Sequence, residues 1–396
     1  MKPIGLINHG NVCYLNSALQ LLYSIKPLRE YLLTNEFRKE INKENSMGSQ
    51  GKYISTLADF FQQYSQGKPD TTKLLTLLSS MFQFGSQHDS HEVLLQLINT
   101  IHEDIKHEKT SPIKEMMFGC LTSKVSCLHC DYISETSSEC SDLSLSIPKW
   151  SIFFSDIEKA NLMTDVIVKI QTFYKGYRKG NEIKICVPRL CTKKQLLEVI
   201  SQELKIQQTD IQKLFVEKND LRREIYECDK INVTNSIIEV HSETNTFSMI
   251  TSKQVTTDDA LHLFSKPIII PEWRCEKCNA HGGKKTLLYT QHPEYILIHI
   301  QLFEMGLYSY KKTSDHLTFP DEFEWKEASE YEHQKVIYEV VGTINHIGCS
   351  FFGHYYSFVK YEDQWYKCND EIITPVMQKD IHTKDTYIIL FKRKKN

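Results

Sequence analysis

The chain has 396 residues, of which 41% are hydrophobic and 24% are charged, and its formal net charge is −3. This length exceeds what one ordinary hydrophobic core holds, so we expect a globular protein with several substructures. The slightly negative charge argues against a protein that binds nucleic-acid backbones, and no apolar run is long enough for a membrane-spanning helix.

The twelve cysteines bear on the compartment in which the protein works. The chain opens Met1-Lys2-Pro3 without the apolar stretch of a signal peptide, so we expect a cytoplasmic or nuclear location. Thiols stay reduced there. The cysteines are therefore candidates for metal ligands, a nucleophile or core packing rather than for disulfides.

The first segment of chemical interest runs from Gly5 to Ser17. Apolar residues recur with helical spacing after Cys13, and Gly10-Asn11 is typical of the turn before a helix. We therefore expect Cys13 in the first turn of a helix, where the positive end of the helix dipole favours a thiolate nucleophile. Asn8 is placed to offer its side-chain amide to the same spot. The alternative is a small buried cysteine without a catalytic role.

Residues 14–115 are expected to be mainly helical, apart from Ser46 to Gly51, whose composition is that of a flexible loop. The strongest helical stripe has a polar start, Gln87 to Glu92. His91-Glu92 resembles the beginning of a zinc-peptidase helix, but the second histidine of that motif is missing. The polar start either caps the helix or lines a site that faces Cys13.

Two C-x-x-C turns lie far apart in the chain. The first falls within residues 117–148, which have strand character, and the second precedes a strand-rich region that starts at 287. Such thiolate pairs are typical of tetrahedral zinc sites, so we expect the two turns to converge on one structural zinc ion. The alternative is four unmetallated thiols. The expected ligands are Cys127, Cys130, Cys275 and Cys278.

Residues 151–255 are expected to form a separate insertion. Two strand patterns, a helix and two further strands follow one another, which is the order of a ubiquitin-like β-grasp module. Gly180-Asn181 indicates a hairpin turn between the first two strands, and Thr192 is expected to cap the helix. An inert surface insertion is the alternative.

The strand-rich C-terminal part contains the remaining members of a catalytic set. His354 lies between a glycine-punctuated loop and a strand, and Asn369-Asp370 begins the turn after the next strand. A cysteine peptidase needs a base for its thiol and a polar side chain that orients the imidazole. Cys13, His354 and Asn369 match this set in type, although each could also be an ordinary structural residue.

Together these segments resemble the ubiquitin-specific proteases, the large papain-like family of deubiquitinases. The zinc turns fall in the expected order between the second and third motifs, and the similarity covers the chain except about 151–255. The motifs are Gly5 to Asn16 around Cys13, Gln87 to Glu92, and Gly353 to Lys360 followed by Trp365-Tyr366 and Asn369-Asp370.

The resemblance implies an α+β, papain-like right hand with a helical thumb, a β palm and zinc-tipped β fingers, plus the inserted β-grasp-type module. In chain order, it implies a thumb at 1–115, the first half of the fingers at 116–150, the insertion at 151–255, the second half of the fingers at 256–290 and the palm at 291–396.

The resemblance also implies roles for individual residues. Cys13 is the nucleophile and His354 the base; Asn369 orients His354, and Asp370 is a second polar partner. Asn8 contributes to the oxyanion hole. Asp89 would face the basic C-terminal tail of ubiquitin. Substrate binding is assigned to Gln87, Asp89, Gly353 and Tyr355.

The function implied is hydrolysis of isopeptide or peptide bonds at the C-terminal glycine of ubiquitin, with structural zinc as cofactor. Ubiquitin and ubiquitinated proteins are the expected partners, an activating protein partner is compatible with the resemblance, and neither nucleic acid nor membrane is expected. His9, Val12, His88, Ser90 and Val93 replace residues that are commoner in the family, which bears on substrate preference.

Three alternatives remain open at the level of the sequence. The first is a catalytically weak ubiquitin-binding scaffold on the same fold. The second is a protease for another ubiquitin-like modifier or an unrelated peptide. The third is a zinc-ribbon protein that binds nucleic acid, which the absence of net positive charge disfavours.

Overall fold

The computed structural model describes residues 2–147, 163–174, 177–188, 190–204, 211–218, 221–225, 230–232, 237–242, 255–305, 310–312, 317–325, 336–349 and 353–394. The chain divides into two compact units, Met1–Ile147 with Val255–Asn396, and Pro148–Gln254. Within the described ranges, none of the helices combines the length and the hydrophobicity that crossing a bilayer requires.

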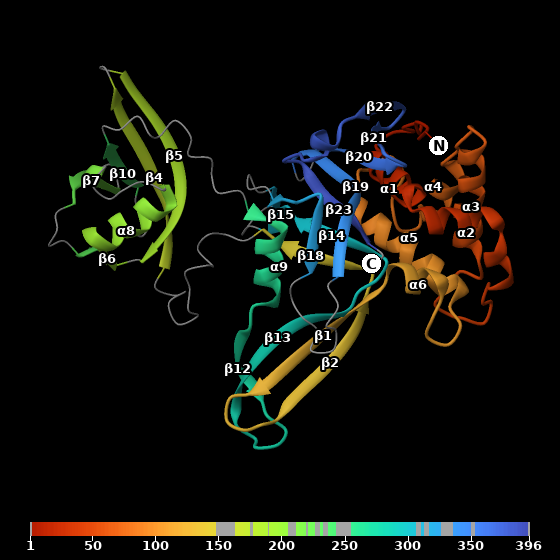
Figure 1. Cartoon of the computed structure of the whole chain (residues 1–396), viewed down its shortest axis with the longest axis horizontal. Helices are drawn as coiled ribbons and strands as arrows, with labels where there is room; N and C mark the ends of the chain where they lie inside the picture. The colour runs from red at the N-terminus through yellow and green to blue at the C-terminus, as the bar shows by residue number, and fades with distance from the viewer. Residues whose placement is uncertain are drawn as a thin grey trace. The chain divides into compact units, whose positions relative to one another are not determined.

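The helices before residue 118 gather at one side of the main sheet of the first unit and form the thumb (Figure 1). The expected helical character of residues 14–115 is thereby confirmed. The helices are α1 (Cys13–Ser24), α2 (Lys26–Thr34), the 3-10 helix η1 (Glu36–Lys39), α3 (Lys52–Ser65), α4 (Thr72–Leu78), α5 (Ser90–Ile105) and α6 (Pro112–Met117).

Helix α1 is the centre of the thumb. All of its residues from Cys13 to Tyr23 are buried, because α1 is packed between α5 and the palm strands β19 (Val336–Gly348) and β20 (Gly353–Tyr361). A Cβ on Gly342 of β19 would lie 2.4 Å from the Leu21 side chain, so glycine permits this close approach. The helix therefore has no solvent-facing stripe, and its polar residues are hydrogen-bonded inside the protein.

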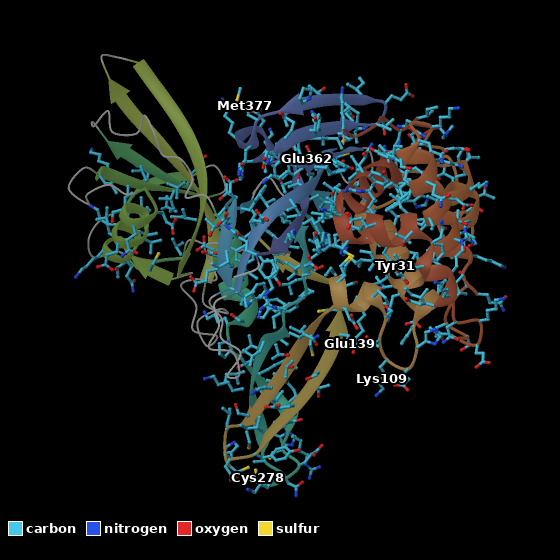
Figure 2. All side chains as sticks on the ribbon, turned by 45° about the vertical axis from the view of Figure 1, so that its right-hand side comes forward. Tyr31, Lys109, Glu139, Cys278, Glu362 and Met377 are labelled. Carbon is cyan, nitrogen blue, oxygen red and sulfur yellow. The ribbon has the colours of Figure 1, made fainter. Side chains whose placement is uncertain are left out.

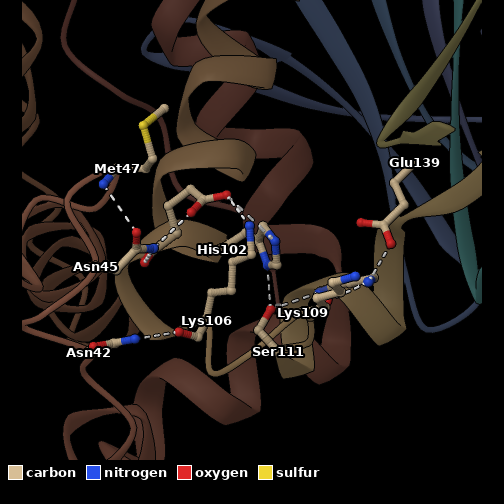
Figure 3. A network of polar contacts seen from close by, with 10 residues as sticks. Asn42, Asn45, Met47, His102, Lys106, Lys109, Ser111 and Glu139 are labelled. Carbon is tan, nitrogen blue, oxygen red and sulfur yellow. Dashed lines mark hydrogen bonds and ion pairs between the residues drawn. The ribbon is translucent and has the colours of Figure 1, made fainter.

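The loop before α3 is held against the C-terminal end of α5 (Figure 3). Asn42 Nδ2 donates to the carbonyl of Lys106 at 2.7 Å, and Asn45 Nδ2 donates to the carbonyl of Glu103 at 2.8 Å. The last carbonyl groups of a helix lack partners within the helix. These two side chains therefore satisfy the end of α5 and fix the loop to it.

Asp104, which is fully buried, anchors the same loop. Its carboxylate accepts hydrogen bonds from the backbone N–H groups of Ser49 at 2.6 Å, Gly51 at 3.2 Å and Ile54 at 3.1 Å. Composition predicted a flexible loop from Ser46 to Gly51, whereas these bonds fix its C-terminal end. A distant buried carboxylate is not visible in local composition.

The palm is an eight-stranded sheet in the order β22-β21-β20-β19-β23-β14-β3, with β18 paired to β19. Most neighbours are antiparallel, but β3 pairs parallel with β14. The range expected for the fingers, 116–150, thus includes one palm strand. The palm strands not yet given are β3 (Asp142–Ser146), β14 (Tyr295–Gln301), β18 (Glu322–Trp325), β21 (Gln364–Asn369), β22 (Ile372–Val376) and β23 (Thr386–Arg393).

A four-stranded sheet in the order β12-β13-β1-β2 forms the fingers. Cys278 lies at the far end of this sheet, and Glu139 lies near its base (Figure 2). The finger strands are β1 (Gly119–Cys127), β2 (Ile133–Cys140), β12 (Ile268–Arg274) and β13 (His281–Gln291). The smaller elements of this unit are α9 (Thr257–Ser265), η5 (Gln378–Ile381), the strand pair β11 (Val255–Thr256) with β17 (Leu317–Thr318), and the strand pair β15 (Phe303–Met305) with β16 (Tyr310–Lys312).

The second unit has the β-grasp topology that the sequence predicted. Its five-stranded sheet has the order β5-β4-β10-β7-β8, and the last strand, β10, lies parallel to the first, β4. Thr192 Oγ1 caps α8 by accepting from the N–H of Gln195 at 3.3 Å. The elements are β4 (Met163–Tyr174), β5 (Tyr177–Pro188), β6 (Leu190–Thr192), α8 (Lys193–Leu204), β7 (Ile211–Lys218), β8 (Leu221–Glu224), β9 (Lys230–Asn232) and β10 (Ile237–Ser242).

One turn prediction in this unit is wrong. Gly180 and Asn181 do not form the hairpin turn; they lie inside β5, paired with Gln171 and Ile170 of β4. The pairing of the two strands continues to Tyr174 opposite Tyr177. The turn preference of a Gly-Asn pair is a local tendency, and the hydrogen bonds of a long strand pair outweigh it here.

Candidate active site

Cys13 is the first residue of α1 and is 3% exposed. The turn before it uses Gly10 and Asn11, both with positive φ (105° and 53°), a conformation that glycine and asparagine adopt more readily than other residues. The N-cap residue, Val12, has no polar side chain to offer the helix start. Cys13 thus stands at the helix end whose unpaired N–H groups attract negative charge.

His354 is the second residue of β20, and its ring contacts both Cys13 and Asn369. The ring's Nε2 lies 2.5 Å from Asn369 Oδ1, which belongs to the neighbouring strand β21. The hydrogen bond with the Cys13 side chain is the largest of the effects that raise the pKa of His354 to about 9; Asn369 acts in the same direction, and burial opposes both. The structure thus brings the three predicted residues together, with His354 hydrogen-bonded to Asn369 and interacting with Cys13.

Asn8 lies on the approach to Cys13, with its side-chain amide fixed at both ends. Its Oδ1 accepts from the N–H groups of Gly10 at 3.0 Å and Val12 at 3.2 Å, while Nδ2 donates to Asp370 Oδ2 at 2.8 Å. One hydrogen of the amide remains for another acceptor. The amide is thereby held in one orientation, and its role as an oxyanion-hole donor stays a prediction.

Asp370 is hydrogen-bonded to two side-chain amides near the site. Its carboxylate accepts from two amides, Asn8 Nδ2 and Asn16 Nδ2, each at 2.8 Å. Its charge also acts on His354 through space and raises the pKa of that imidazole. Asp370 therefore joins Asn8 to helix α1.

Gln87 to Glu92, the second motif, supports α5 and the strand that carries His354. Asp89 is the N-cap of α5: its Oδ1 accepts from the N–H of His91 at 2.7 Å, and its Oδ2 accepts from the hydroxyl of Tyr387 at 2.6 Å. Gln87 bonds to the backbone of Gly353 through both ends of its side-chain amide. The capping alternative is thus present in the structure, and substrate contact by these residues stays a prediction.

The four cysteines of the two C-x-x-C turns meet at the tip of the fingers, and their sulfur atoms all lie within 4.8 Å of one another. Cys127 Sγ is 3.7 Å from Cys278 Sγ, and Cys130 Sγ is 3.6 Å from Cys275 Sγ. A tetrahedron with Zn–S bonds of about 2.3 Å has sulfur–sulfur edges of about 3.8 Å. The donor set therefore fits zinc in both chemistry and spacing, and the predicted convergence is confirmed.

Comparison with known proteins decides the family. The family model described as ubiquitin carboxyl-terminal hydrolase matches residues 4–391. The chain belongs to this family. Its fold is that of a ubiquitin-specific protease catalytic domain: 99% of the chain matches the structure of the SAGA Ubp8/Sgf11/Sus1/Sgf73 DUB module bound to ubiquitin aldehyde, over 70% of that chain, with a TM-score of 0.64 and 18% identity.

Curated relatives of this ubiquitin carboxyl-terminal hydrolase family member are longer proteins. A probable ubiquitin carboxyl-terminal hydrolase 4 of Schizosaccharomyces pombe is 23% identical over 426 aligned residues, covering 99% of the chain and 59% of the relative. Ubiquitin carboxyl-terminal hydrolase 32 of Drosophila melanogaster is 27% identical over 216 residues, covering 46% of the chain and 12% of the relative. The chain thus spans less than two thirds of each.

Two further residues, Asn16 and His346, contact the site although the sequence motifs assign them no role. Asn16 lies one helical turn after Cys13, and this i, i+3 spacing could have indicated that it faces the same way. His346 lies under Gly353, the residue before His354. No local signal reveals His346, because its position depends on the pairing of β19 with β20.

Proposed function

We propose that this protein is a deubiquitinase, a cysteine hydrolase that cleaves the bond after the C-terminal glycine of ubiquitin. The observation that carries the proposal is that Cys13, His354 and Asn369 come together, with His354 hydrogen-bonded to Asn369, in a member of the ubiquitin carboxyl-terminal hydrolase family. Nucleophile, base and orienting group are all present in the order that thiol hydrolysis needs.

Acylation starts from the thiolate of Cys13 beside the imidazolium of His354. The sulfur attacks the carbonyl carbon of the terminal glycine, and His354 gives its proton to the departing lysine amine as the C–N bond breaks. A thioester remains. His354 then takes a proton from water, the water oxygen attacks the thioester, and Cys13 leaves as the thiolate while His354 keeps the proton. The enzyme thus returns to its starting state.

Asn8 stabilises the negative oxygen of each tetrahedral intermediate with the amide hydrogen that Asp370 does not use. Asp370 sets the direction of that amide and ties it to Asn16 on α1. The oxyanion donor therefore moves with the helix that carries the nucleophile. An amide oriented in advance does not have to reorganise during the reaction, which is the basis of this kind of stabilisation.

Zinc bound by Cys127, Cys130, Cys275 and Cys278 would have a structural role, because four thiolates leave no open coordination position. The ion would join the two C-x-x-C turns of the fingers. Cysteine thiolates at both the metal site and Cys13 suit the reducing cytosol or nucleus. Ubiquitinated proteins are the proposed substrates. The Ubp8 module contains Sgf11, Sus1 and Sgf73, and a protein that assists this chain is proposed by analogy.

A ubiquitin probe with a C-terminal electrophile tests the proposal. The wild-type protein is expected to form a covalent adduct, and Cys13→Ala is expected to form none. Cys349→Ala, which removes an exposed cysteine of the palm, serves as the matched control and is expected to react like wild type. Absence of an adduct with the wild-type protein would overturn the proposal.

The same assay separates the alternatives. A non-catalytic scaffold would bind ubiquitin without forming an adduct. A protease for another modifier would react with probes built on that modifier and leave the ubiquitin probe unchanged. Parallel probes that differ only in the modifier therefore distinguish these cases from a deubiquitinase.

A further inference from the structure

Gln87 links the thumb to the palm directly beside the catalytic histidine. Its Nε2 donates to the carbonyl of Gly353 at 2.5 Å, and its Oε1 accepts from the N–H of Gly353 at 3.0 Å. One side-chain amide thus pairs with both backbone groups of one residue, as a neighbouring strand would. Gln87 lies just before α5, whereas Gly353 is the first residue of β20.

The carbonyl that Gln87 holds belongs to the peptide bond between Gly353 and His354. Since a peptide unit is planar, fixing this carbonyl fixes the direction in which the backbone of His354 begins. On its other edge, β20 pairs with β19, with Gly348 opposite Gly353 and Ile347 opposite His354. Asn369 orients the imidazole ring, and Gln87 restrains the backbone from which that ring extends.

A second contact holds the same residue from a different direction. A Cβ on Gly353 would lie 1.9 Å from His346 Nε2, so the buried His346 ring packs directly against the Gly353 backbone. The Tyr355 ring packs on His346 with a centroid distance of 4.7 Å. The residues on both sides of His354 therefore rest on one buried ring, and Gln87 closes the exposed side.

The segment that carries Gln87 also contacts the helix of the nucleophile. Ser90 Oγ donates to the carbonyl of Tyr14 at 2.9 Å and lies 3.2 Å from Ser17 Oγ. Residues 87–90 thus touch α1 next to Cys13 at one end and β20 next to His354 at the other. A short segment with fixed contacts at both ends sets the separation of the two elements.

We propose that Gln87 is a positioning residue that holds β20, and with it His354, at the distance from Cys13 that catalysis requires. This inference rests on the proposed function of the Cys13 site, but it assigns to Gln87 a role within the enzyme rather than a contact with ubiquitin. Gln87 touches neither reacting atom; it acts through the peptide bond of Gly353.

Alkylation of Cys13 by iodoacetamide across a range of pH tests the proposal without any ubiquitin, with labelling of the Cys13 peptide followed by mass spectrometry. Gln87→Ala is expected to lower the rate at neutral pH by at least threefold and to shift the pH profile, because the imidazole no longer stays beside the sulfur. Gln87→Glu keeps one acceptor for the Gly353 N–H but loses the donor, so its rate should lie between those of Gln87→Ala and wild type.

The control is Gln83→Ala, which removes an exposed glutamine from the same loop and should leave the alkylation rate within twofold of wild type. Ubiquitin affinity is measured separately in a Cys13→Ala background, where Gln87→Ala is expected to change Kd by less than twofold. Unchanged alkylation with weakened ubiquitin binding would show that Gln87 is a substrate contact and would overturn the inference. Unchanged alkylation with unchanged binding would overturn it as well. Failure of the deubiquitinase proposal itself would appear in the probe assay instead.

Discussion

Replacing Asp370 with Asn tests whether the carboxylate acts through the oxyanion donor. Asp370 has φ of +50°, and asparagine tolerates this conformation, so the backbone should stay in place. The variant has one carbonyl oxygen where the carboxylate had two acceptors, and an NH2 group then faces either Asn8 or Asn16, both of which donate. Where the NH2 group faces Asn8, that amide loses its acceptor; where it faces Asn16, the link from the Asn8 partner to helix α1 is lost instead.

The magnitude follows from what an oxyanion donor contributes. Removing one such donor lowers kcat by about 10²–10³-fold. Asn8→Ala should therefore show a loss of this size, and Asp370→Asn, which only misdirects the donor, a loss of about 10–100-fold. If Asp370 acts through Asn8, the double variant should be no slower than Asn8→Ala alone.

The assay is steady-state hydrolysis of a fluorogenic amide at the C-terminus of ubiquitin, with kcat and KM determined for wild type, both single variants and the double variant. KM should change little, because the lost interaction exists only in the transition state. Losses that multiply in the double variant would refute the argument. They would point to the alternative that Asp370 acts on His354, whose pKa its charge also raises.

Three further predictions concern stability. Asp104→Ala leaves buried backbone N–H groups without acceptors and should lower the free energy of unfolding in urea by about 3 kcal/mol or more. The control Asp59→Ala removes an exposed carboxylate with ion pairs at 3.9 Å and should lower it by less than about 1 kcal/mol. Similar losses in the two variants would contradict the anchoring role of Asp104. Burial lowers the pKa of His299 to about 3, so the folded state prefers the neutral ring. The free energy of unfolding should therefore be largest above about pH 6.5 and fall by about 2 kcal/mol at pH 5. His299→Gln should reduce this pH dependence, and an unchanged dependence in the variant would contradict the assignment to His299. Metal analysis should find about one zinc per chain, and chelation should lower Tm, whereas a metal-free protein of full stability would exclude the zinc site.

Local sequence patterns predicted those features that depend on neighbouring residues. Helix α1 begins at Cys13 because a glycine-containing turn is followed by a run of helix-compatible apolar residues, and Thr192 caps α8 for similarly local reasons. The two C-x-x-C pairs indicated a shared metal site because cysteine pairs with this spacing are typical of zinc ligands. The same patterns misplaced the hairpin turn at Gly180-Asn181, where strand pairing overrode a local preference.

The contacts that shape the site could not be predicted in this way. The bond between Gln87 and Gly353 joins residues 266 positions apart, and the bond between Asn8 and Asp370 joins residues 362 positions apart. The resemblance named Asp370 as a second polar partner in the site, and the structure adds that its carboxylate accepts from Asn8 and Asn16. Side-chain partners depend on strand register and helix packing, which local sequence does not specify.

The amino-acid sequence by itself determined which chemical groups are available: a thiol at a helix start, an imidazole on a strand, an amide after the next strand, and two pairs of thiols. It also determined the order of strands and helix in the inserted module. Only the tertiary structure decided how those groups are oriented, because orientation is set where α1, α5 and β20 pack together, and each of these elements takes its position from residues far away in the chain.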